Sequence, residues 1–267
     1  MTSARREPAW RALRRSSGLA LDLGSARTRV WTRAHTILDA PTVSFGPADD
    51  AGVVRPVERG AIVDSDGAAR LLTRLLAPRV PRYARPVIVC TTPVLGGAEH
   101  RAELAAVLAG LRPRSVLAID TVRALALAAG ADLSRPLLVV DLGAQLTEVA
   151  LLCDGTVSAA RRVEHGTGDL PTLTARRLAD RVTEAVTGLV REDPRPEFVD
   201  ALARGPLLGG GGALRPELVH RLARQLNTSV RPVPRPHTAA VRGAAAALDS
   251  ARRHPVLATP VGPAGPA

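Results

Sequence analysis

Residues 137–152 have the sequence LLVVDLGAQLTEVALL, in which two aliphatic runs are joined by a short Asp-Leu-Gly turn that begins at Asp141. The first run alternates too little to have a solvated face, so it predicts a buried strand and not an edge strand. A second copy, LALDLGSARTRVW, covers residues 19–31 and has Asp22 in the matching position. The glycine that ends each Asp-Leu-Gly lets the backbone approach a ligand closely. The sequence therefore predicts two strand–turn–strand units, one in each half of the chain.

The remaining sequence predicts the same series of elements twice. Strands are predicted at residues 19–23, 28–33, 36–38, 85–92 and 115–120, and again at 137–142, 147–152, 157–163, 207–208 and 229–232. Helices are predicted at residues 68–76, 98–111 and 121–129, and again at 170–191, 216–226 and 238–251. The prediction is an α/β fold of two duplicated βββαβαβα domains, with a ligand cleft between them that takes one Asp-x-Gly turn from each.

The predicted domain boundaries follow from this repeat. In chain order they are a basic N-terminal arm at 1–17, a first domain at 18–135 with a small insertion at about 41–81, a second domain at 136–250, and a disordered Pro/Ala/Gly-rich tail at 251–267. The last helix of the second domain, at about 238–250, is expected to return to the first domain.

The composition limits the classes of function. The chain has 267 residues, of which 46% are hydrophobic and 23% charged, as in a globular protein. Aromatic residues make up only 2%, which predicts a core of Leu, Val and Ala and argues against a nucleic-acid binder with stacking platforms. The net charge of +11 comes from arginine alone, since the chain has no lysine. This excludes a Walker-type phosphate loop and a Schiff-base lysine.

The basic charge has two interpretations, an anionic partner or a coding bias towards arginine. The arginines are spread along the chain, so no nucleic-acid partner is expected. Cys90 and Cys153 lie in apolar runs and are expected to be reduced core residues. No cleavable signal or membrane span is recognised, which predicts a cytoplasmic protein. Residues 1–17 surround Trp10 with arginines, and are either a peripheral membrane anchor or a disordered tail.

Several motifs together resemble one family. LALDLGSARTRVW resembles the first phosphate loop of the actin-like ATPases, and LLVVDLGAQLTEVALL resembles the second. GPLLGGGGAL, at residues 205–214, resembles their adenosine-binding glycine loop. RPVERGAIVDSD (55–66) and PHTAAVRGAAAAL (236–248) resemble the MreB/Mbl family of bacterial actin homologues in order and spacing. The resemblance covers residues 18 to about 248 and implies the actin-like ATPase, ribonuclease H-like fold.

The resemblance also implies ATP and Mg²⁺ as cofactors. Backbone N–H groups of glycine-rich turns cradle phosphates, and Asp22 and Asp141 would hold a hydrated Mg²⁺. Glu99, which opens a predicted helix, matches the family's residue that positions the attacking water; alternatively it is a first-turn carboxylate facing the helix dipole. The nucleotide-binding residues carried over by motif are Asp22, Gly24, Ser25, Ala26 and Arg27, then Asp141, Gly143, Ala144, Gln145 and Leu146, and beside the adenosine Gly210, Gly211, Gly212, Ala213 and Leu214.

The sequence also departs from the family. Ala144, Gln145 and Leu146 stand where the family has Gly, Gly and Thr, which narrows the space for a phosphate and removes a hydroxyl. Arg27 replaces the usual asparagine and could itself reach a phosphate. After Val163 the chain lacks the family's extra subdomain, which carries a Glu and a Lys that hold the ribose and adenine. The sequence therefore keeps the phosphate frame of the family but lacks half of its base pocket.

Three functional hypotheses remain. The first is an ATP-binding cytoskeletal protein that self-associates into filaments and contributes to cell-shape or cell-wall organisation with membrane-associated shape or cell-wall synthesis proteins. The second is a degenerate, non-hydrolysing scaffold for protein partners that uses the same fold. The third, a sugar kinase or chaperone of the same superfamily, ranks last because no substrate loop and no peptide-binding domain is recognised.

Overall fold

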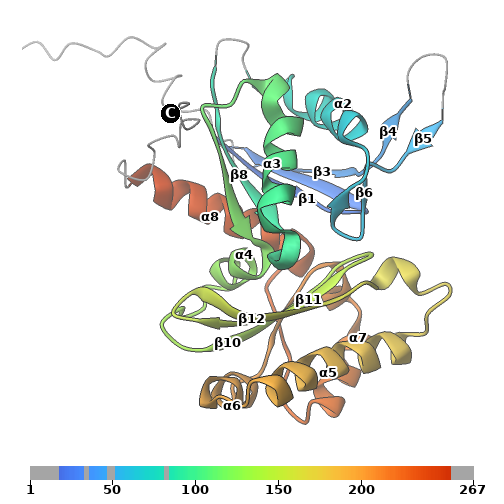
Figure 1. Cartoon of the computed structure of the whole chain (residues 1–267), viewed down its shortest axis with the longest axis vertical. Coiled ribbons are helices and arrows are strands. Elements are labelled where there is room, and N and C mark those ends of the chain that lie inside the picture. The colour runs from blue at the N-terminus through green and yellow to red at the C-terminus, as the bar shows by residue number, and fades with distance from the viewer. Residues whose placement is uncertain (1–17, 33–35, 47–51, 81–83, 254–267) are drawn as a thin grey trace, which may run out of the picture.

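Two five-stranded sheets, one from each half of the chain, form the framework of the molecule (Figure 1). The structure is a computed structural model that describes residues 18–32, 36–46, 52–80 and 84–253. The predicted basic arm at 1–17 and residues 254–267 of the predicted tail lie outside the described residues, whereas residues 251–253, predicted to be part of that tail, belong to the last helix. In Figure 1 the first sheet occupies the upper half of the molecule and the second sheet the lower half.

The two sheets have the same topology. The first has the strand order β3-β2-β1-β8-β9 and the second β12-β11-β10-β13-β14. In each, the central strand pairs antiparallel with the next strand and parallel with a later one. The strands of the first sheet are β1 (Gly18–Leu23), β2 (Arg27–Thr32), β3 (Ile37–Pro41), β8 (Val87–Thr92) and β9 (Ser115–Asp120). Those of the second are β10 (Leu137–Leu142), β11 (Thr147–Cys153), β12 (Thr156–Val163), β13 (Leu207–Gly209) and β14 (Arg231–Pro232). The predicted βββαβαβα duplication is confirmed.

The aliphatic run of β10 is buried on both faces, as predicted. Leu138 and Val140 belong to the core that the second sheet forms with helix α5 (Ala175–Glu192). Leu137 and Val139 point to the opposite face and pack against helix α4 (Thr121–Ala128). A strand with core on both faces has no solvated side, which explains the lack of alternation in its sequence.

The helix boundaries differ from the predicted ones where a capping residue intervenes. Helix α2 (Ser65–Leu76) begins three residues early because the Asp64 carboxylate accepts a hydrogen bond from the Gly67 N–H at 2.8 Å. Helix α5 begins at Ala175, later than predicted, because Thr174 caps it. The remaining helices are α3 (Gly97–Leu108), α6 (Pro196–Ala203), α7 (Pro216–Gln225) and α8 (Ala239–Arg253). None of the helices in the described ranges is long and apolar enough to cross a lipid bilayer.

Two small hairpins precede helix α2 in the insertion at about 41–81, and the sequence did not predict them. They are β4 (Ser44–Phe45) with β5 (Val53–Val54), and β6 (Val57–Glu58) with β7 (Ala61–Ile62). In the second hairpin the turn residues Arg59 and Gly60 both have positive φ, at 45° and 79°. Two such residues give the tight turn whose twist matches that of the flanking strands.

The connection from β12 to α5 is short. Only residues 164–174 join them, and they contain a single 3₁₀ turn at Thr167–Asp169. All of these residues are described, and no subdomain is inserted there. The region that would carry the missing ribose and adenine contacts is therefore absent from the fold.

Helices α4 and α8 cross between the two sheets. Helix α4 follows the first sheet in sequence but packs on the second. Helix α8 ends the second half but packs on β1 and β8 of the first sheet, through Val241 and Leu248. The two helices meet at Ala124 and Gly243, where a Cβ on Gly243 would lie 1.8 Å from the Ala124 carbonyl oxygen. Only glycine allows this approach.

We expect Gly243→Val to destabilise the protein, although valine has a higher intrinsic helix propensity than glycine. The added side chain has to force α4 and α8 apart, and overpacking of this kind costs about 1–3 kcal/mol or more. Urea denaturation followed by circular dichroism measures the loss. Ala246→Val is the matched control, because Ala246 is exposed on the same helix. Equal stability of the two variants would contradict the tight crossing.

Candidate functional site

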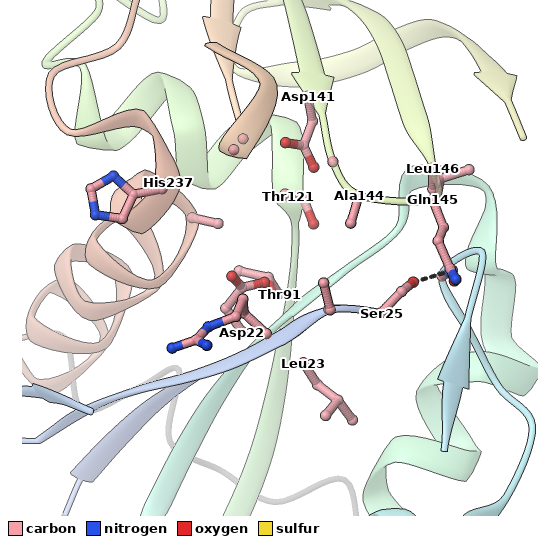
Figure 2. Close-up of a pocket in the computed structure, with 18 of the residues that line it drawn as sticks. Asp22, Leu23, Ser25, Thr91, Thr121, Asp141, Ala144, Gln145, Leu146 and His237 are labelled. Carbon is pink, nitrogen blue, oxygen red and sulfur yellow. Dashed lines mark hydrogen bonds between the residues drawn. The ribbon is translucent and has the colours of Figure 1, made fainter. Parts of the chain in front are cut away.

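A cavity of about 260 Å³ lies between the two sheets, where β1 and β10 end in their Asp-x-Gly turns (Figure 2). Asp22 and Asp141 enter it from opposite sheets. The fold brings together every residue predicted in the two turns, together with part of the glycine loop. These lining residues are Asp22, Gly24, Ser25, Ala26, Arg27, Asp141, Gly143, Ala144, Gln145, Leu146, Gly210 and Gly211. Their binding of a nucleotide remains a prediction.

The two turns are built alike. In the first, the Gly24 N–H donates a hydrogen bond to the Arg27 carbonyl oxygen at 3.1 Å, and in the second the Gly143 N–H donates to Leu146 at 3.0 Å. A Cβ on Gly143 would lie 2.7 Å from that Leu146 oxygen. Glycine is therefore required for this turn to close.

A later segment supports each turn from behind. The Thr42 hydroxyl donates to the Gly24 carbonyl oxygen at 2.7 Å, and its backbone N–H donates to Ala26 at 3.0 Å. In the second unit the Thr167 N–H donates to the Gly143 carbonyl oxygen at 3.0 Å. The carbonyl groups of both turns are thus held by the protein, which fixes the backbone around the cavity.

The glycine loop packs directly against the second turn. Gly210 has a φ of +79°, and a Cβ there would lie 2.6 Å from the Asp141 Oδ1 atom. Gly212 and Ala213 are buried beneath the loop and Leu214 is 56% exposed, and none of the three lines the cavity. The loop therefore contributes Gly210 and Gly211 to the lining of the cavity, and the predicted roles of the other three residues stay predictions.

The Asp22 carboxylate is already engaged on both oxygens. Its Oδ1 accepts a hydrogen bond from the Thr91 hydroxyl at 2.9 Å, and its Oδ2 lies 3.6 Å from the Arg29 Nη1. Burial raises the pKa of Asp22, and the Arg29 charge opposes that rise. Asp22 is therefore paired before any ligand arrives.

The Asp141 carboxylate has no hydrogen bond or ion pair with the part of the chain that the structure describes. Burial, followed by the negative charges of Asp22 and Glu148, raises the pKa of Asp141 to about 8. A carboxyl group with that pKa is mostly protonated at neutral pH. It ionises there only when a cation or a donor approaches it.

Contacts across the cleft involve the residues of the second turn that depart from the family pattern. The Gln145 Oε1 accepts a hydrogen bond from the Arg59 N–H at 3.1 Å, and the Leu146 side chain packs against Gly60. The Arg59 guanidinium donates to the Glu164 carbonyl oxygen and lies 3.8 Å from the Asp169 carboxylate. The β6–β7 turn, which belongs to the first half of the chain, thus contacts the second half at one side of the cavity.

Sequence reasoning missed other residues that line the cavity, among them Arg29, Thr91, Thr121, Glu148, Thr167 and His237. Glu148 is 2% exposed, and its Oε2 accepts a hydrogen bond from the Val94 N–H at 3.1 Å, which links the two units. Burial raises the pKa of Glu148. A carboxylate inside an apolar strand was the signal that could have identified it. The His237 Nδ1 is buried without a hydrogen-bond partner in the described chain.

Glu99 lies in the first turn of α3, is exposed, and is not among the residues that line the cavity. Its predicted role of positioning the attacking water remains untested. As placed here, its side chain shows only the features of an exposed carboxylate at a helix start.

The residues present do not fit the two-carboxylate Mg²⁺ site that the family resemblance implies. Such a site places a divalent cation against both carboxylates, and a fixed positive charge beside one of them repels the ion. Asp141 is free, but Asp22 carries both the Thr91 hydroxyl and the Arg29 guanidinium. The cavity is therefore built around one free carboxylate and one carboxylate paired with an arginine.

Comparisons with known proteins agree with this geometry. The family model for the MreB/Mbl protein matches residues 46–172. The structure of MreB5 of Spiroplasma citri bound to ADP is 14% identical, covers 90% of this chain and 98% of that one, and superimposes with a TM-score of 0.78. The MamK double helical filament is 14% identical, covers 87% of this chain and 99% of that one, and has a TM-score of 0.72. The ethanolamine utilization protein EutJ from Carboxydothermus hydrogenoformans is 18% identical, covers 85% of this chain and 88% of that one, and has a TM-score of 0.60. The search of curated protein sequences returned no match.

The duplicated sheets, the paired Asp-x-Gly turns and the crossing helices define a protein with the actin-like ATPase fold. Within that class the family match and the structural neighbours agree with the motifs. The chain therefore has an actin-like fold, and over residues 46–172 it is similar to the MreB/Mbl family of bacterial actin homologues.

We expect the melting temperature of the protein to fall as the pH rises from about 6 to about 9, with Asp141→Asn showing a shallower fall. The folded state keeps a proton on Asp141 up to its pKa of about 8, whereas the unfolded chain releases it near the ordinary value of about 4. Stability from this group is therefore full at low pH and is lost as the pH rises. Thermal denaturation in EDTA measures the slope.

Asp249→Asn is the control for the pH experiment, because Asp249 is exposed on α8 and should leave the slope of the wild-type protein unchanged. A slope in Asp141→Asn that equals the wild-type slope would show that Asp141 titrates normally.

Proposed function

We propose that this protein is a nucleotide-binding, actin-like cytoskeletal protein whose filaments contribute to cell-shape or cell-wall organisation. One observation carries the proposal: the two turns and the glycine loop, far apart in the sequence, line one cavity between the two sheets. The solved structures of MreB5 bound to ADP and to AMPPNP support a nucleotide as the ligand. The MamK filament supports self-association.

In this proposal the two turns hold the phosphates and the glycine loop holds the adenosine. Backbone N–H groups of glycine-rich turns form concave sites for anions. The cavity of about 260 Å³ is near the lower limit of ligand pockets, which enclose about 300–1,000 Å³. We therefore expect it to enclose the phosphate chain, with the adenosine over Gly210 and Gly211 and less fully covered.

Gly211→Leu should weaken nucleotide binding strongly without unfolding the protein. Gly211 lines the cavity, yet a Cβ on it meets no protein atom within 4 Å, so a leucine there projects into ligand space. Isothermal titration calorimetry with ADP and ATP measures the effect, and we expect the affinity of the variant to fall at least about tenfold.

Gly110→Leu is the matched control for this experiment. Gly110 is exposed, lies outside the cavity, and has only the Thr73 hydroxyl at 4.0 Å from its would-be Cβ. Undiminished binding by Gly211→Leu would place the nucleotide elsewhere. Absence of binding by the wild-type protein would refute the proposal.

Filament formation and location are parts of the same proposal. We expect a cytoplasmic protein that self-associates and meets membrane-associated shape or cell-wall synthesis proteins. Sedimentation and negative-stain electron microscopy with and without nucleotide test the self-association. Protein that stays in the supernatant under every nucleotide condition would contradict it. The membrane contact predicted for residues 1–17 falls outside the described residues.

A non-hydrolysing scaffold with the same fold is the second candidate, and the second turn favours it. Gln145 is committed to the contact with Arg59, and Ala144 carries a side chain into the cavity. Glu99 does not line the cavity at all. The groups that a hydrolase needs around the terminal phosphate and its attacking water are thus replaced or displaced.

For a scaffold we expect no phosphate release from ATP above that of buffer, measured with a coupled phosphate assay at saturating nucleotide. An ATPase activity that Asp22→Ala abolishes would contradict the scaffold and favour a cytoskeletal protein that hydrolyses ATP. Asp66→Ala serves as the control, because Asp66 is an exposed carboxylate on α2 outside the cavity.

A further inference from the structure

Arg29 occupies a defined place in the cavity. Its side chain is 14% exposed, its Nη1 lies 3.6 Å from the Asp22 Oδ2, and its Nε donates a hydrogen bond to the Asp39 Oδ2 at 3.2 Å. The strand register fixes this arrangement: Asp22 on β1 pairs with Arg29 on β2, and Arg29 pairs with Asp39 on β3. Directly opposed residues on neighbouring strands share one face of a sheet. The guanidinium is therefore held between two carboxylates in a single row.

The row leaves donor capacity for a ligand. A guanidinium has five N–H donors in a planar fork. The Nε donor goes to Asp39 and the Nη1 faces the Asp22 carboxylate, whereas the Nη2 of Arg29 has no hydrogen-bond partner within the described ranges. Asp39 is also shared with Arg27, whose Nε donates to the Asp39 Oδ1 at 2.7 Å. Two arginines thus face two carboxylates, and Arg29 lines the cavity with unused donors.

A divalent cation and this guanidinium compete for the same carboxylate. Mg²⁺ requires an octahedral shell of oxygens and retains several waters. A guanidinium beside Asp22 takes the place of those waters, and its positive charge repels the ion. Arginine stays charged at any physiological pH and matches the geometry of phosphate oxygens. The residue that excludes the ion thus supplies the charge and the donors that the phosphates need.

We propose that Arg29 replaces the divalent cation in this protein: its guanidinium binds the phosphates of a nucleoside di- or triphosphate, so that binding does not require Mg²⁺. The inference rests on the proposed nucleotide binding and adds the group that holds the phosphates. Because the guanidinium is part of the chain, the positive charge at the site then does not depend on the concentration of Mg²⁺.

The primary test uses the wild-type protein and isothermal titration calorimetry with ADP and ATP, in excess EDTA and in millimolar MgCl₂. We expect similar affinity in both conditions. Binding seen only with Mg²⁺ overturns the inference and leaves the proposed function intact. Binding in neither condition refutes the proposed function, and the inference with it. Inorganic pyrophosphate distinguishes the sources of phosphate: we expect it to bind more weakly than ADP, and equal affinity would overturn the nucleoside part.

The variants assign the effect to the guanidinium. Arg29→Met should weaken ADP binding in EDTA at least about tenfold, and Mg²⁺ should then restore part of it because Asp22 is released. Arg29→Lys keeps the charge without the fork and should fall between the two. Arg70→Met, on α2 and outside the cavity, controls for the change in net charge. Circular dichroism verifies folding, and a folded Arg29→Met that binds ADP in EDTA like the wild type overturns the assignment.

Discussion

The crossing of α4 and α8 is the constraint on which the rest of the structure depends. Each helix leaves one half of the chain and packs on the sheet of the other, and the two meet where Gly243 has no side chain to separate it from Ala124. This contact leaves no room for a side chain between two helices that each pack on a different sheet. The turns at the ends of β1 and β10 therefore face each other across one cavity.

The charges in that cavity are distributed unevenly between its two sides. The first turn has its carboxylate compensated, because strand register places Arg29 beside Asp22. The second turn has a carboxylate without a partner in the described chain, and burial raises the pKa of Asp141 to about 8. A buried carboxyl in this state either keeps its proton or requires a ligand that supplies donors. The two sides of the cavity therefore differ in charge: Arg29 lies beside the carboxylate of the first turn, and a buried carboxyl without a partner in the described chain lies at the second.

Sequence patterns predicted the fold well because the fold depends on short-range chemistry. The unalternating run of β10, the glycines of the two turns and the order of strands and helices all appear in the structure where they were expected. The small hairpins between β3 and α2 were missed, since two-residue strands carry too little periodicity to be detected. The start of α5 was misplaced because its cap, Thr174, stands in a polar stretch that resembles a helix start at several positions.

The sequence by itself determined which residues could form the site: two Asp-x-Gly turns and a glycine loop, each defined by neighbours along the chain. Only the tertiary structure decided which of them meet. It brought Arg29 to Asp22 through strand register, joined Gln145 to Arg59 across the cleft, and left Glu99 outside the cavity. The physical reason is one of range. Turn geometry and burial depend on adjacent residues, whereas an ion pair or a shared cavity depends on the distance between segments that only the packed core brings together.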